Sequence, residues 1–331
     1  MAEGRSRALG WLAGALMLLG ACSAGGPLPA GRTAPDPHAA RIAPEDAPPH
    51  TTGRPGVMAA SDGGEVVVSE WGAEEPSAVI LALHGYGDYG DLTFRRAAPF
   101  WAEQGIATIA PDQRGFGRNG SRGRWPGADG LVADARGYVG QVRARFPCTP
   151  VILLGHSMGG GVAASAASGA PIDGLLLATP AIWGGGRLNP LHRAAAWIAA
   201  MVVPDQRFSG RGVVRIQASD NIEALRELSG DPLYLAPPSP REIFGLVRLV
   251  DQAAKSAGQI TAPALMLLGS KDQIVPNATV RKVFARTAGP RKVIEYPEGW
   301  HLVFRDHQAK TVWQDVADWV GTVPAPSCAA S

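Results

Sequence analysis

The stretch "LLGHSMGGG", residues 153–161, places one serine among glycines at the junction of two expected elements. The apolar run 150–155 predicts a buried strand, and the small residues that follow the serine predict a helix. Gly155 and Gly159 complete the pattern G-x-S-x-G, in which a sharp strand-to-helix turn leaves no room for side chains two residues either way. Such a turn raises the Ser157 hydroxyl above the carboxyl edge of a sheet. The alternative is a glycine-rich turn without chemistry.

The rest of the chain alternates short apolar runs with segments of helical spacing. Strands are expected at 64–71, 78–85, 106–112, 150–155, 172–179, 262–270 and 291–298, and helices at 93–105, 130–146, 157–168, 276–287 and 305–321. Such alternation predicts an α/β fold, with a mostly parallel sheet covered by helices on both faces. Between about residues 180 and 259 two helices, 191–203 and 241–258, but no strand are expected. We interpret this part as a helical cap inserted into a single folded domain of residues 56–331.

A serine hydroxyl needs a base and an orienting acid, which in folds with this turn follow in the order serine, acid, histidine. His301 lies in "PEGWHLVF", directly after an expected strand, and is the best-placed histidine. Asp272 lies in "LLGSKDQIVP", directly after the expected strand before it. Taken singly, Asp272 could cap a helix and His301 could be a packed core residue. Their joint placement after successive late strands favours catalytic roles.

Two backbone N–H groups are expected to stabilise the oxyanion that forms when a serine attacks a carbonyl. Met158 follows the serine and supplies one of them. The glycine-rich segment "LHGYGDYG", residues 83–90, follows an early strand, and the N–H of Tyr86 is expected to supply the other. No histidine, cysteine and aspartate residues have the spacing of a zinc site, and no loop is arranged to hold phosphate. The chemistry therefore calls for no metal or cofactor.

The N-terminus has the layout of a secretory signal, with arginines before an apolar run that is too short for a normal transmembrane helix. Residues 19–22, LGAC, resemble the lipobox of bacterial lipoproteins, which predicts a signal peptide over 1–21 and a lipid on Cys22. An ordinary signal peptide with an incidental cysteine is the alternative. The proline-rich residues 22–55 would then form a stiff tether. This arrangement predicts a lipid-anchored protein of the bacterial cell envelope, attached to a membrane and facing the periplasm or the exterior.

The net charge argues against nucleic acid as a partner, and the cysteine content bears on disulfide pairing. The chain has 331 residues and a formal net charge of +2 at pH 7, which gives no basic surplus for nucleic acid. Of its three cysteines, Cys148 and Cys328 remain if Cys22 carries lipid. In an oxidising compartment these two could pair, or both could stay as unpaired thiols.

The motifs together resemble the α/β-hydrolase superfamily, specifically its monoacylglycerol lipase and lysophospholipase-like branch, the serine aminopeptidase-like hydrolases. The resemblance extends from Gly64 to Val320 and rests on five segments: 84–87, 111–119, 155–160, 269–276 and 299–301. It implies a helical cap and the following roles: nucleophile Ser157, acid Asp272, base His301, and oxyanion donors Tyr86 and Met158. The lipid anchor and tether depart from the family, because many relatives are soluble or cytosolic.

The favoured function is a serine esterase that cleaves a single-chain lipid, such as a monoacylglycerol or a lysophospholipid. Apolar residues of the expected cap would either line an acyl tunnel or bury the cap against the body: Ile182, Trp183, Trp197, Ile198, Met201 and Val202. An aminopeptidase or amidase of the same fold is an alternative, but the acidic residues of the cap show no cluster to hold an amine. A non-catalytic envelope binding protein is another, and the intact triad argues against it. The sequence leaves the head group, the acyl length and the oligomeric state open.

Overall fold

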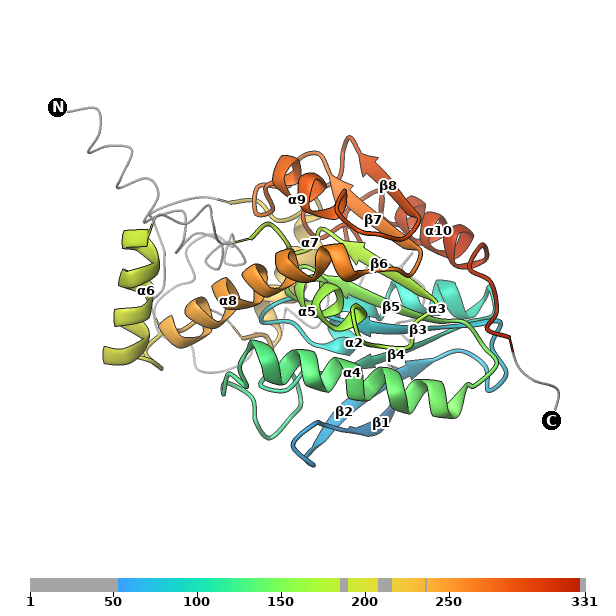
Figure 1. Ribbon diagram of the computed structural model, residues 1–331, viewed down its shortest axis with the longest axis horizontal. Coiled ribbons are helices and arrows are strands. Elements are labelled where there is room, and N and C mark those ends of the chain that lie inside the picture. Colours follow the sequence, from blue (N-terminus) through green and yellow to red (C-terminus); the bar gives the residue numbers. More distant parts are fainter. Residues whose placement is uncertain (1–52, 185–189, 208–215, 236, 328–331) are drawn as a thin grey trace.

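The structure is a computed structural model that describes residues 53–184, 190–207, 216–235 and 237–327 (Figure 1). Its centre is one eight-stranded sheet with the order β1-β2-β4-β3-β5-β6-β7-β8. The strands are β1 (Arg54–Ala59), β2 (Glu65–Trp71), β3 (Ala78–Leu83), β4 (Ile106–Pro111), β5 (Val151–His156), β6 (Gly174–Ala178), β7 (Ala264–Gly269) and β8 (Arg291–Tyr296). Pairing is antiparallel from β1 through β2 to β4 and parallel from β4 through β3 to β8. The predicted α/β fold with a mostly parallel sheet is confirmed.

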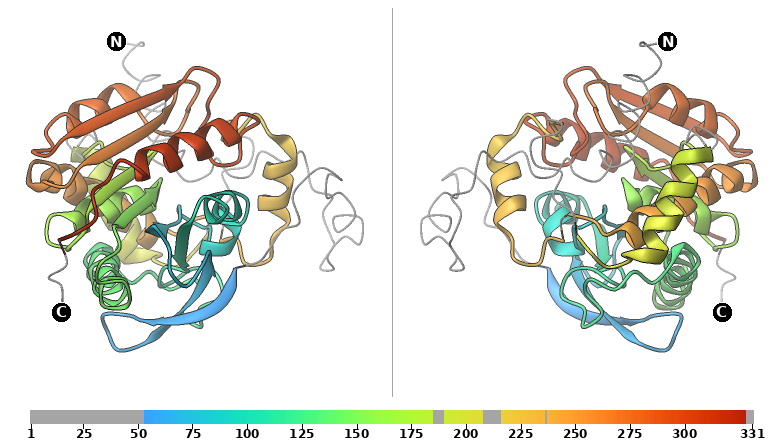
Figure 2. Two further views of the ribbon diagram at one scale, coloured as in Figure 1. Left: turned by 90° about the vertical axis from the view of Figure 1, so that its right-hand side faces the viewer. Right: turned by 90° about the vertical axis from the view of Figure 1, so that its left-hand side faces the viewer.

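Helices cover both faces of this sheet. Every residue of β3, β4, β5, β6 and β7 is buried, as expected for parallel strands that are covered on both sides. The helices that pack on one face are α4 (Ala128–Arg145), α5 (Met158–Ala167), α8 (Pro240–Ser256) and α9 (Asn277–Phe284). Those on the other face are α3 (Ala97–Ala102) and α10 (Ala309–Val320). Figure 2 shows the sheet twisting between the two layers, from the blue β1–β2 hairpin to the orange β8.

Two details near the N-terminus differ from the sequence prediction. Strand β1 was not predicted, and it begins at Arg54, inside the expected tether. The single helix expected over 93–105 is two short helices, α2 (Gly90–Phe94) and α3. Pro99 explains the break, because proline has no N–H and its ring collides with the carbonyl four residues earlier in a continuous helix. Residues 22–52 of the expected tether, which include Cys22, and the signal peptide 1–21 lie outside the described residues.

The segment between β6 and β7 carries α6 (Pro190–Val202), α7 (Ile222–Gly230) and α8, and no strand interrupts its described residues. Helix α7 was not predicted. Helix α8 does not belong wholly to a cap, because it packs on α4 and α5, and Leu249 in its middle is fully buried in the core. Its N-terminal half extends toward α6 (Figure 1), and Arg193 of α6 pairs with Asp251 in its C-terminal half at 2.7 Å.

The six apolar residues considered for the cap lie in two different environments. Ile182 is buried in the core, and Trp183 packs against the core. The other four lie on α6 and are all more than half exposed: Trp197, Ile198, Met201 and Val202. Their exposure contradicts the idea that these four bury the cap against the body, and it equally contradicts the idea that they line a closed acyl tunnel.

Two further observations concern cysteine and membrane segments. Cys148 is disulfide-bonded, and the two other cysteines of the chain, Cys22 and Cys328, lie outside the described residues. Within the described ranges no helix combines the length and the apolar character needed to cross a bilayer.

Candidate active site

Ser157 stands on a strained turn between β5 and α5. Its backbone has φ 53°, a left-handed conformation that non-glycine residues rarely adopt. The glycines on either side make this turn possible, since a Cβ on Gly155 would lie 2.5 Å from the carbonyl carbon of Gly159. A Cβ on Gly159 would in turn lie 2.6 Å from the carbonyl oxygen of His84. The sequence around Ser157 therefore folds as the motif predicted, with the hydroxyl at the carboxyl end of a central strand.

His301 reaches Ser157 from the loop after β8. Its Nε2 lies 2.9 Å from the Ser157 Oγ, and the residue is 4% exposed. The His301 carbonyl accepts hydrogen bonds from the hydroxyl of Thr179 at 2.9 Å and from Nε2 of His156 at 3.1 Å. Thr179 has φ 40°, so a second strained residue, at the end of β6, serves to hold this loop.

Asp272 completes a chain of three side chains. Its Oδ2 lies 2.9 Å from Nδ1 of His301, and its side chain is fully shielded from solvent. Its Oδ1 accepts the backbone N–H groups of Ile274 at 2.7 Å and Val275 at 3.0 Å. The ionised carboxylate can only accept, so Nδ1 of His301 carries the proton and Nε2 is free to accept one from the serine. The structure thus brings together the three residues that the sequence singled out from distant segments.

The two expected oxyanion donors flank Ser157. Met158 opens α5, and Tyr86 lies in the loop after β3. That loop touches the serine, because a Cβ on Gly85 would lie 3.3 Å from the Ser157 Cβ. Within the described part of the chain, neither the N–H of Tyr86 nor that of Met158 has a hydrogen-bond acceptor. Unpaired N–H groups beside a nucleophile are suited to bind a developing oxyanion.

Comparison with known proteins identifies the family. The serine aminopeptidase family, S33, matches residues 74–308. The chain belongs to this family. The monoacylglycerol lipase of Mycolicibacterium smegmatis is 29% identical over 267 residues, which cover 78% of this chain and 93% of the relative. Phospholipase YtpA of Bacillus subtilis is 25% identical over 254 residues, which cover 74% of this chain and 95% of the relative.

Solved structures of similar proteins share the fold. The monoacylglycerol lipase of Paleococcus ferrophilus gives a TM-score of 0.66 at 21% identity, covering 79% of this chain and 100% of that one. A soluble variant of the monoglyceride lipase of Saccharomyces cerevisiae gives 0.68 at 20% identity, covering 84% and 97%. This S33 family member therefore has the α/β-hydrolase fold.

Two buried histidines brace the site without reaching the serine hydroxyl. Nε2 of His84 accepts the N–H of Gln113 at 2.8 Å, so its Nδ1 carries the proton and donates to the Gly85 carbonyl at 2.8 Å. Burial lowers the pKa of His84. Burial, with a smaller contribution from His301, lowers the pKa of His156 to about 3. Both are therefore neutral near pH 7 and act as fixed hydrogen-bonding groups in the S33 fold.

The loop after β8 that carries His301, here called the histidine loop, carries further polar residues that the sequence analysis did not single out. Asp306 accepts the N–H of Trp300, next to the histidine, at 2.7 Å and the hydroxyl of Ser219 at 2.6 Å. Burial raises the pKa of Asp306 to about 6. Arg305 pairs with Asp88 of the Tyr86 loop at 2.7 Å, and both side chains are buried. No motif marks these contacts, because each joins segments that meet only in the folded chain.

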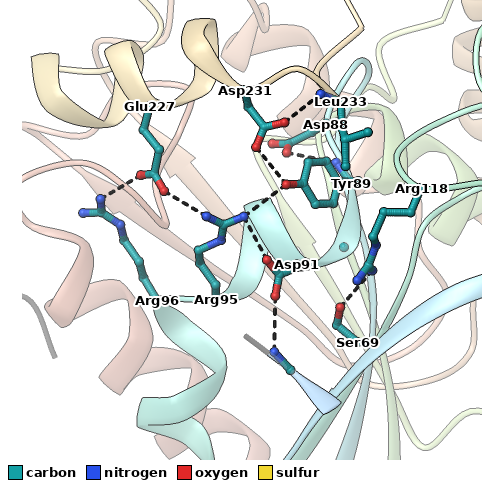
Figure 3. A network of polar contacts seen from close by, with 12 residues as sticks. Ser69, Asp88, Tyr89, Asp91, Arg95, Arg96, Arg118, Glu227, Asp231 and Leu233 are labelled. Atoms are coloured by element: carbon teal, nitrogen blue, oxygen red, sulfur yellow. Dashed lines mark hydrogen bonds and ion pairs between the residues drawn. The ribbon is translucent and has the colours of Figure 1, made fainter. Parts of the chain in front are cut away.

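A second group of polar residues ties α2 to α7 of the cap (Figure 3). The Tyr89 hydroxyl donates to Asp231 at 2.8 Å and accepts from Arg95 at 3.1 Å. Glu227 of α7 accepts from Arg95 at 3.2 Å and from Arg96 at 2.8 Å.

The described residues include no cluster of three or more histidine, cysteine, aspartate or glutamate side chains placed to hold a metal ion.

Proposed function

We propose that this protein is a serine esterase that cleaves carboxylic esters of single-chain lipids, either monoacylglycerols or lysophospholipids. The single observation that carries the proposal is the chain from Ser157 Oγ through His301 to Asp272, with both contacts at 2.9 Å. Nucleophile, base and orienting acid at hydrogen-bond distance are the arrangement that acyl transfer to a serine requires.

The reaction follows from this geometry. His301 Nε2 takes the proton of Ser157 as Oγ bonds to the ester carbonyl carbon, and the N–H groups of Tyr86 and Met158 bind the resulting oxyanion. The ester C–O bond then breaks, His301 gives its proton to the leaving alcohol, and an acyl-enzyme remains. A water molecule, deprotonated by His301, then attacks the acyl carbon. The bond from that carbon to the Ser157 Oγ breaks, His301 returns its proton to Oγ, and the fatty acid is released. Asp272 holds the imidazole in the tautomer that each step needs.

Two observations support a lipid as the substrate. The similar proteins described above include a monoacylglycerol lipase and a phospholipase, and both are covered over more than nine-tenths of their length. The exposed face of α6 carries Trp197, Ile198, Met201 and Val202, which is a surface suited to an apolar environment. Both observations favour an ester that resides in or near a membrane.

The predicted lipid anchor belongs to the same proposal. A lipid on Cys22 would hold the esterase at a membrane of the bacterial cell envelope, where such substrates reside. We expect a palmitate analogue fed to expressing cells to label the wild-type protein. Label retained by Cys22→Ala would contradict the anchor without affecting the esterase proposal.

The esterase proposal is tested by hydrolysis of p-nitrophenyl esters from acetate to palmitate, comparing the wild type with Ser157→Ala. We expect activity to rise with acyl length and to fall by about three orders of magnitude or more in the variant. A fluorophosphonate probe should label the wild type and not the variant. Equal activity in both proteins would overturn the assigned nucleophile, and a sharp optimum at acetate would contradict a lipid substrate.

The family description keeps an aminopeptidase as a second candidate. An aminopeptidase needs a carboxylate that faces the substrate amine, but three acidic residues of the cap segment already have partners. Asp205 pairs with Arg241, Glu227 pairs with two arginines, and Asp231 accepts from Tyr89. Hydrolysis of aminoacyl p-nitroanilides faster than that of long-chain esters would favour the peptidase. Absence of probe labelling would favour a non-catalytic envelope binding protein.

A further inference from the structure

The side chain of Tyr86 reaches the cap segment, where it contacts α8. Its ring packs edge-on against Phe116, with centroids 5.4 Å apart, and its hydroxyl donates to Oε2 of Glu242 at 2.8 Å. Burial, reinforced by the charge of Glu242, raises the pKa of Tyr86, so the hydroxyl stays protonated and remains a donor. One residue therefore presents its backbone N–H beside Ser157 and anchors its side chain on α8.

Glu242 is a fixed acceptor for that hydroxyl. It lies in the first turn of α8, is 2% exposed, and accepts the N–H of Ser239 at 2.6 Å as part of a capping box. Arg207 donates to both of its oxygens, at 3.0 Å and 2.8 Å. A buried carboxylate with a bidentate guanidinium and a backbone donor has little freedom to move.

The backbone next to Tyr86 is held by the same part of the chain. The N–H of Leu235 donates to the Gly87 carbonyl at 2.8 Å. Gly87 has φ 78°, and a Cβ there would lie 2.6 Å from the Leu235 carbonyl oxygen, so only glycine allows this close approach. Two hydrogen bonds, one from the start of α8 and one from the segment before it, therefore hold the adjacent residues 86 and 87.

We propose that Glu242 is a positioning residue for the oxyanion hole: by fixing the Tyr86 hydroxyl, it aims the Tyr86 N–H at the oxyanion. The inference rests on the proposed esterase function, because it assigns that N–H to the oxyanion. A donor in a preorganised site acts through its direction and distance, and losing one donor outright lowers kcat by about 10²–10³. Loosening the donor instead of removing it should cause a smaller loss of the same kind.

The position of Tyr89 on the same loop provides a matched control. Its hydroxyl also donates to a carboxylate of the cap segment, Asp231, at 2.8 Å (Figure 3). Its N–H, however, is already bound to the Asp88 carboxylate at 2.9 Å and so cannot serve an oxyanion. Tyr86→Phe and Tyr89→Phe each remove a hydroxyl that donates to a carboxylate. Tyr89→Phe also removes the acceptor of Arg95, so the control loses at least as many contacts, but only Tyr86→Phe loosens an oxyanion donor.

The experiment measures kcat and KM on a p-nitrophenyl ester, together with binding of an alkyl trifluoromethyl ketone, for full-length Tyr86→Phe, Tyr89→Phe and Glu242→Gln. The serine Oγ bonds to the carbonyl carbon of the ketone, so the ketone oxygen becomes an oxyanion in the hole. An ester that is bound but has not reacted forms no oxyanion. We expect Tyr86→Phe to lower kcat and ketone affinity together by about tenfold, with KM changed by less than about twofold. Glu242→Gln keeps an oxygen for the Tyr86 hydroxyl but sets its NH₂ group against Arg207, so it should act in the same direction with a smaller loss. Tyr89→Phe should change each value by less than about twofold.

Equal losses in the two phenylalanine variants, or a change in KM alone, would overturn the inference, because either result indicates a contact that only seats the cap. A wild type that neither hydrolyses esters nor reacts with fluorophosphonate would overturn the esterase function itself, and this inference with it. An active wild type with an unaffected Tyr86→Phe variant would overturn this inference alone. Thermal unfolding of each variant shows whether Glu242→Gln still folds, and Tyr86→Phe tests the same contact without changing a charge.

Discussion

The orientation of Asp272 makes Asp272→Asn a sharp test of the triad. In the wild type, Oδ1 accepts two backbone N–H groups, those of Ile274 and Val275, while Oδ2 faces Nδ1 of His301. An asparagine keeps the two backbone hydrogen bonds only if its oxygen takes the place of Oδ1. Its NH₂ group then faces His301, so Nδ1 must become the acceptor and the proton moves to Nε2. The imidazole in that tautomer cannot accept the proton of Ser157.

The size of the effect follows from the alternative orientation of the amide. Turning the asparagine over would restore the tautomer but would set its NH₂ group against the two backbone donors. Each buried donor left without an acceptor costs about 1–3 kcal/mol, so the active orientation is disfavoured by about 2–6 kcal/mol. That range corresponds to a loss in kcat between about 30-fold and about 10⁴-fold. The upper end agrees with the general effect of this substitution in serine triads, about 10⁴.

The assay is the steady-state hydrolysis of a p-nitrophenyl ester by the wild type and by Asp272→Asn, with thermal unfolding as the test of an intact fold. We expect a folded variant whose kcat falls by at least about 30-fold while KM changes little, because no proposed binding contact is removed. A folded variant that keeps kcat within about threefold of the wild type would refute the reasoning. Asp272 would then be a structural residue of the loop, and the tautomer would be fixed by another group.

Three other changes test the surroundings of the triad. Gly155→Ala would push a methyl group into the backbone of Gly159. Urea denaturation should therefore show a free energy of unfolding lower by about 3 kcal/mol. An unchanged free energy would contradict the close approach of the two residues. The pKa of Asp306 is higher in the folded protein, so the folded state binds this proton more tightly than the unfolded state. The free energy of unfolding should therefore fall by about 3 kcal/mol as the pH rises from about 4 to about 6. Asp306→Asn should remove this pH dependence. Arg305→Met leaves the buried Asp88 carboxylate unpaired and should lower the free energy of unfolding by about 3–5 kcal/mol. Adding Asp88→Asn should recover part of this loss, and strictly additive losses would show that the pair is not coupled.

The sequence was informative where the chemistry depends on local geometry. The turn at Ser157 needs glycines at fixed offsets, so the pattern is written into consecutive residues and predicts both the strand before it and the helix after it. The ends of parallel strands also lie at one edge of a sheet, so Asp272 and His301 could be placed beside the serine from strand prediction alone. Helix α7 and strand β1 lacked such signals, because α7 is short and β1 begins in a proline-containing segment.

The residues that the sequence did not reveal hold the reacting groups in place. Thr179 binds the His301 carbonyl, and Asp306 binds the N–H of Trp300, yet neither belongs to a motif with fixed spacing. These hydrogen bonds depend on tertiary contacts between the cap segment, the histidine loop and the sheet. Such contacts join residues far apart in the chain and leave no local pattern in the sequence. The triad can therefore be predicted residue by residue, whereas its rigidity is a property of the assembled fold. For this reason the tests of Glu242, Asp306 and the Asp88–Arg305 pair measure kcat, stability or coupling, and do not ask only whether activity survives.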